Sequence, residues 1–72
     1  MGVTEDIADD LAKQALQIEA KTGDEKVVDK VSEILGASSQ TTQEAYLTSV
    51  RVRRAELRAR TYLSQFDESS DD

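Results

Sequence analysis

The 72-residue chain carries fifteen acidic and nine basic side chains, a formal net charge of −6 at pH 7. This balance argues against a protein whose whole surface binds nucleic acid or an anionic membrane. The chain contains neither cysteine nor histidine, which excludes disulfides, thiolate chemistry and the commonest general base and transition-metal ligand. A single domain this short buries only about 60% of the surface that its unfolded chain exposes, so a partner chain would add useful stability.

The charge is unevenly distributed along the chain. Residues 1–36 are acidic, residues 37–66 hold all five arginines with only two acids, and residues 67–72 add four acids. No segment is a continuous apolar run of the length that a signal peptide or a membrane-spanning helix needs. We therefore expect a cytoplasmic protein without membrane contact.

A first helix is predicted over residues 4–22. The Thr4 hydroxyl can cap its start, and Gly23 suits the left-handed position just past a helix end. Apolar residues recur at helical spacing on one stripe, which Ala8, Ala12 and Leu16 widen: Val3, Ile7, Leu11, Ala15 and Ile18. This stripe is the expected core face of the helix.

A second helix is predicted over residues 24–35, with Asp24 as its cap and Gly36 as its stop. Its apolar face is the most regular in the chain and consists of Val27, Val28, Val31, Ile34 and Leu35. Valines are poor helix formers, because the branched side chain loses rotamer freedom. Packing must therefore stabilise this segment. Residues 37–40 are expected to form a short polar loop.

A third helix is predicted over residues 41–66. Thr41 and Glu44 have the spacing of a capping box, and no proline or glycine interrupts the segment. A helix of this length spans about 39 Å at 1.5 Å per residue. Residues 67–72 contain no apolar side chain and are expected to be a disordered acidic tail.

These elements predict an all-α fold, a single domain over residues 1–66 with two short helices and one long C-terminal helix in an antiparallel bundle. The third helix is longer than either of the others, so its last turns should project beyond them. Exposed apolar residues there would mark an interaction site. We expect self-association to complete the fold, most simply as a two-fold homodimer, or else a different protein partner. The alternative is a monomer in which the third helix bends, or the first tilts, to bury the same residues.

The third helix has two apolar faces, which is typical of a helix with two packing partners. One face carries Tyr46, Leu47, Val50 and Leu57 and should pack against the first two helices. The other is the predicted protein interface and consists of Val52, Ala55, Ala59, Tyr62, Leu63 and Phe66.

An arginine ridge, Arg51, Arg54 and Arg58, lies between the two faces at spacings of three and four residues. Such a ridge could contact phosphates, with Tyr46 or Tyr62 stacking on a base. We favour the alternative that the arginines pair with acids of the first two helices or of the tail, such as Asp9, Asp10, Glu33 or Asp71. On the other flank, Glu56 has the spacing to pair with Arg53 and Arg60.

Catalysis has little support in the sequence. Two acid pairs have i, i+4 spacing, Asp6 with Asp10 and Glu25 with Asp29, but the exteriors of acidic helices produce such pairs routinely. The three glycines stand alone, so no phosphate-binding loop is present. We predict a small interaction or regulatory protein, with no enzymatic activity, cofactor or metal. The alternatives are nucleic-acid binding through the arginine ridge and a structural subunit of a larger cellular or viral assembly.

Overall fold

Three α-helices make up the fold. The computed structural model describes residues 2–70, with side chains described for residues 2–66. The helices are α1 (Val3–Thr22), α2 (Lys26–Ser38) and α3 (Gln40–Ser70). Each helix contacts both of the others, and residues 2–70 contain no strand. The predicted all-α class is therefore confirmed.

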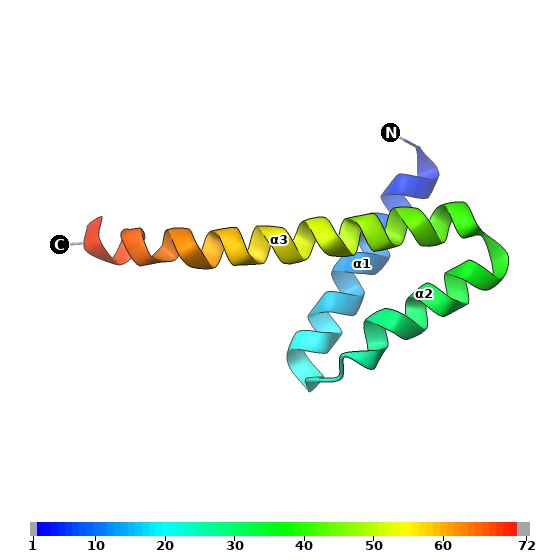
Figure 1. The fold of residues 1–72 in the computed structure, drawn as a ribbon, viewed down its shortest axis with the longest axis horizontal. Helices are drawn as coiled ribbons and strands as arrows, with labels where there is room; N and C mark the ends of the chain where they lie inside the picture. The colour runs from blue at the N-terminus through cyan, green and yellow to red at the C-terminus, as the bar shows by residue number, and fades with distance from the viewer. Residues whose placement is uncertain (1, 71–72) are drawn as a thin grey trace.

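The arrangement differs from the predicted antiparallel bundle, which is not confirmed. Figure 1 shows α2 running back from the end of α1 toward the start of α3, while α1 crosses α3 steeply instead of lying alongside it. The Cα trace extends over 52 × 30 × 13 Å. A chain this flat has one small core at the place where α1 and α2 meet the N-terminal half of α3.

The corner between α1 and α2 forms as the sequence predicts. Gly23 has φ 76° and ψ 7°, the left-handed conformation, and its N–H donates to the Glu19 carbonyl at 2.8 Å. The Asp24 carboxylate then accepts a hydrogen bond from the Lys26 backbone N–H at 2.9 Å. Asp24 therefore caps the start of α2, although the regular helix begins only at Lys26.

α1 begins within one residue of its predicted start, but the predicted cap is wrong, because Thr4 lies inside the helix. Gly2 is the N-terminal cap, in an extended conformation. Its backbone N–H donates to Oε1 of Glu5 at 3.1 Å, so the first-turn acid satisfies a backbone donor that the Thr4 hydroxyl was expected to serve.

The predicted end of α2 is also wrong, because the helix continues through Gly36 to Ser38. A Cβ atom at Gly36 would lie 2.5 Å from Nε2 of Gln43 on α3. That amide donates to the Ser32 carbonyl at 3.0 Å. Gly36 therefore allows a side chain of α3 to reach the backbone of α2, a role that the local sequence cannot distinguish from a helix stop.

The connection to α3 is a single residue, Ser39, instead of the predicted loop over residues 37–40. Its backbone is extended, and its Oγ accepts a hydrogen bond from the Thr42 N–H at 3.1 Å. Ser39 therefore caps α3, and the predicted capping box of Thr41 and Glu44 is wrong. Ser39 is an effective cap because it occupies the position just before α3, where a side-chain oxygen can accept a hydrogen bond from a free N–H of the first turn.

The C-terminal helix is longer than predicted. α3 has 31 residues and continues to Ser70, four residues beyond the predicted end at Phe66. The predicted disordered tail is therefore helical over residues 67–70, where no proline or glycine breaks the helix; residues 71–72 lie outside the described part of the chain. Within residues 2–70, no helix combines the length and the apolarity that crossing a membrane requires.

The core is small and is built around one tyrosine. Tyr46 is the largest fully buried side chain, and the other buried residues are small: Ala8, Ala12, Ala15, Val28 and Val50. The predicted core stripe of α1 is partly wrong, since Val3, Ile7 and Ile18 are exposed. The alanines of the predicted face, Ala8, Ala12 and Ala15, are buried in one cluster with Tyr46 and Val50 of α3. Their short side chains let the two helices approach closely.

Candidate protein-interaction surface

The C-terminal half of α3 projects beyond α1 and α2, as the helix lengths predict (Figure 1). All six residues of the predicted interface are exposed: Val52, Ala55, Ala59, Tyr62, Leu63 and Phe66. The three largest side chains, Tyr62, Leu63 and Phe66, retain 58, 57 and 57% of their accessible surface. The alternative in which α3 bends or α1 tilts to cover them does not occur in this chain.

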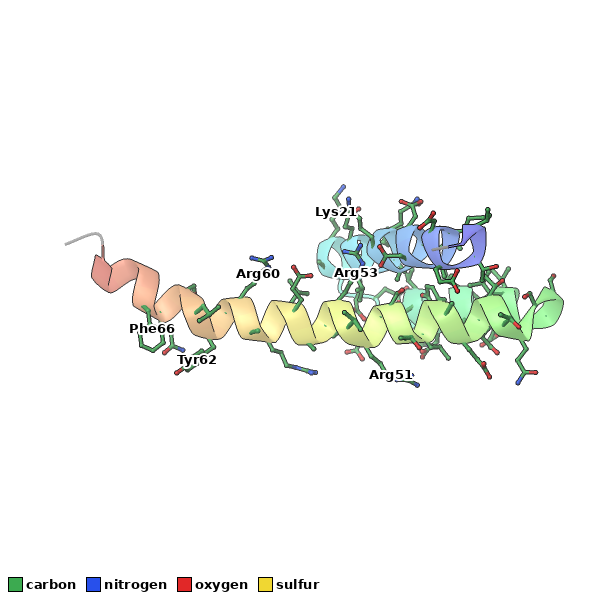
Figure 2. The ribbon with its side chains drawn as sticks, turned by 90° about the horizontal axis from the view of Figure 1, so that it is seen from above. Lys21, Arg51, Arg53, Arg60, Tyr62 and Phe66 are labelled. Carbon is green, nitrogen blue, oxygen red and sulfur yellow. The ribbon has the colours of Figure 1, made fainter. Side chains whose placement is uncertain are left out.

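The two exposed aromatic rings lie together. Tyr62 and Phe66 are one helical turn apart, and their ring centroids are separated by 5.3 Å in an edge-to-face arrangement. Figure 2 shows both rings projecting from α3 on the side away from α1, the same side as Arg51. Arg53 and Arg60 project toward the side on which α1 lies. The aromatic pair therefore faces away from the core.

The other apolar face of α3 packs as predicted only in its N-terminal half. Tyr46 and Val50 are buried, and the Tyr46 hydroxyl donates to the Val28 carbonyl at 2.8 Å. This burial raises the pKa of Tyr46 above its ordinary value of 10.0. Leu57, on the same face, is exposed. It borders a groove of about 280 Å³ between α1 and α3, together with Leu16 and Ala20 of α1 and the charged residues Lys13, Arg53 and Glu56.

An ion pair that the sequence does not predict joins α1 to α3. Nε and Nη2 of Arg53 donate to Oδ1 and Oδ2 of Asp9 at 2.9 and 2.8 Å. This two-point geometry orients the helices as well as attracting them. Hydrogen bonding to the guanidinium lowers the pKa of Asp9 below its ordinary value of 3.8 and raises the pKa of Arg53. Sequence spacing placed Arg53 near Glu56 of its own helix, and only the helix crossing brings it to Asp9.

The three arginines of the ridge differ in whether they form an ion pair. Nη2 of Arg54 donates to Oε2 of Glu19 on α1 at 3.2 Å, whereas Arg51 and Arg58 form no ion pair among the side chains of residues 2–66. The predicted pairing with acids of the first two helices is therefore found for Arg54, with a different acid. Arg60 pairs with Glu56 at 2.8 Å, as its spacing predicts.

The Arg53 to Asp9 pair should make stability depend on acid. The pKa of Asp9 is lower in the folded chain than in the unfolded one, so the pair stabilises the fold above pH 3.8 and stops doing so as the pH falls through the lowered value. We expect Asp9→Asn to melt at a lower temperature than the wild type at pH 7 and at the same temperature near pH 2. Thermal melts followed by circular dichroism check this.

A matched control is Asp10→Asn, which removes an equal charge at the next position. Asp10 accepts a hydrogen bond from Gln14 on its own helix and forms no ion pair with an arginine in the described part of the chain. Its melting temperature should differ less from the wild type. Equal effects of the two variants at both pH values would mean that the total negative charge of the chain, and not the pair with Arg53, sets the pH dependence of its stability.

Comparison of the chain with protein-family models, curated protein sequences and solved structures finds no match.

Proposed function

We propose that this chain is a small interaction protein that binds another protein chain through the exposed apolar face of α3. The observation that carries this proposal is the exposure of Tyr62, Leu63 and Phe66 together on one projecting helix end. Apolar side chains gathered in this way on a small protein are typical of an interaction site. The enzyme, cofactor and metal alternatives have no comparable observation in their favour.

The position of the surface supports the proposal. From Val52 to Phe66 it covers fourteen helical steps, about 21 Å of α3. Its aromatic residues, Tyr62 and Phe66, lie on the side of α3 away from α1 (Figure 2). A partner helix could therefore bind along it without displacing α1 or α2. Helical partners commonly recognise such a face through apolar side chains three and four residues apart.

In this proposal, the arginines at the edge of the surface orient the partner. Arg51 and Arg58 are exposed, and solvated charges at the rim of an interface contribute more to orientation and association rate than to affinity. Binding of nucleic acid through the ridge has weaker support, because Arg54 already pairs with Glu19 and the acids outnumber the bases. If binding to α3 changes the activity of the partner protein, this chain acts as a regulator of that activity.

Static light scattering of the purified chain over a dilution series tests the proposal. We expect the weight-average mass to rise above the 8.0 kDa of one chain as concentration increases. The midpoint should change little with salt, because apolar burial, which is not screened, supplies most of the affinity. A mass of 8.0 kDa at every concentration, with the fold equally stable after Leu63 and Phe66 are both replaced by aspartate, would contradict the proposal.

A further inference from the structure

The apolar residues on the exposed side of α3 have the spacing of a coiled coil. Five of them alternate at intervals of three and four residues: Val52, Ala55, Ala59, Tyr62 and Phe66. We call these five residues the seam. This is the a and d pattern of a helix that pairs with another helix, with Leu63 immediately beside it. Every residue of the seam is exposed, so no part of the described chain serves as its partner.

The seam changes in size along its length. Its N-terminal half presents Ala55 and Ala59, whereas its C-terminal half presents Tyr62 and Phe66. If a second α3 lies antiparallel with Ala55 opposite the second copy's Phe66, then Ala59 lies opposite its Tyr62. Four successive layers then each contain one small and one large side chain, which fills space evenly. A parallel pair would place alanine on alanine and aromatic on aromatic.

The charges of α3 favour the same direction. Residues 51–60 contain five arginines and one glutamate, and two of these arginines, Arg51 and Arg58, form no ion pair among the side chains of residues 2–66. Residues 61–70 contain two acids and no base. In the antiparallel alignment just described, residues 51–60 of one copy lie against residues 61–70 of the other. A parallel pair would align the arginine-rich segment with itself, where like charges repel.

We propose that the occupant of the exposed face is a second copy of this chain, bound through an antiparallel coiled coil of the two α3 helices with Ala55 opposite Phe66 and Ala59 opposite Tyr62. The pairing is isologous, so each copy contributes the same surface. In each copy, α1 and α2 lie on the side of α3 away from the seam. The α1 and α2 helices of one copy are therefore at the opposite end of the pair from those of the other copy. This inference rests on the proposed function and adds the partner, the direction and the register.

Disulfide cross-linking tests the direction, since the natural chain has no cysteine. Ala55→Cys and Phe66→Cys are made as separate full-length variants, and each is oxidised alone and as an equal mixture. We expect the mixture to give dimers that join position 55 to position 66, identified by peptide mass, and each variant alone to give little dimer. Ser64→Cys, on the opposite side of α3, is the control and should not cross-link in any combination.

The outcomes separate this inference from the proposed function. Light scattering that shows a dimer, together with Phe66→Cys chains linked to one another, would overturn the antiparallel register and leave binding through α3 intact. A dimer in which Ser64→Cys links as readily as the seam variants would also overturn the register. A chain that remains monomeric at every concentration would overturn this inference, because it excludes a second copy as the partner of α3.

A size exchange tests the register without oxidation. Ala55→Phe puts two large side chains in each of the two layers that join positions 55 and 66, and Phe66→Ala puts two small ones in each. Each variant alone should therefore raise the dimer Kd about tenfold or more. The double variant restores one small and one large side chain per layer and should return the Kd to within about threefold of the wild type. Additive weakening in the double variant would overturn the register. All three variants alter exposed residues, so each single chain should still fold.

Discussion

Tyr46→Ala is expected to lower the free energy of unfolding by about 3–5 kcal/mol, the usual cost of removing a buried aromatic ring. Native domains are stable by only about 0.05–0.15 kcal/mol per residue, so this loss approaches the whole stability of a 72-residue chain. The effect is large because Tyr46 is the only large side chain among the six that form the buried core, and α1, α2 and α3 meet around it. Urea denaturation followed by far-ultraviolet circular dichroism measures it.

Two other substitutions separate the parts of this effect. Tyr46→Phe keeps the ring and removes only the hydrogen bond to the Val28 carbonyl, so it should cost about 0.5–1.5 kcal/mol. Tyr62→Ala truncates the same type of side chain at an exposed position. Measured where the wild type is monomeric, it should change stability by less than about 0.5 kcal/mol. Equal losses for Tyr46→Ala and Tyr62→Ala would contradict a core centred on Tyr46.

Leu63→Asp combined with Phe66→Asp is expected to abolish association while the single chain remains folded. Burial of one such apolar side chain contributes about 1.5–3 kcal/mol, and a symmetric dimer loses four of them. Even if these side chains are only partly buried in the dimer, replacing them should raise the Kd by about a hundredfold or more. The exposed positions cost the monomer little, because both side chains already contact water. Light scattering and thermal melts on the same samples measure the two effects.

Thr61→Asp with Ser64→Asp is the matched control for this variant. It adds the same two charges at the same end of α3, on the side opposite the seam, where both hydroxyls bond only to carbonyls of their own helix. Association should stay within about tenfold of the wild type if apolar contact drives it. An equal loss in both double variants would mean that net charge, and not the surface of Leu63 and Phe66, controls association.

The number and type of helices could be predicted from local patterns. Helical spacing of apolar residues, a glycine suited to a left-handed turn and the absence of proline are properties of neighbouring residues, and Gly23 ends α1 as predicted. The predictions that failed involve residues whose role depends on a distant segment. Gly36 resembles a helix stop, but Gln43 of α3 lies against it and α2 continues.

The same division applies to the surface. The sequence by itself determined that α3 has two apolar faces and is longer than its neighbours, because periodicity and length follow from helix geometry. Only the tertiary structure decided how α1 crosses α3, because the crossing brings Ala8, Ala12 and Ala15 into one cluster with Tyr46 and Val50, which are distant from them in sequence. That crossing joins Asp9 to Arg53, 44 residues apart in sequence, and Glu19 to Arg54. It also leaves the apolar face with Tyr62, Leu63 and Phe66 exposed. The residue pattern of a single helix cannot show which of its faces the other helices leave uncovered.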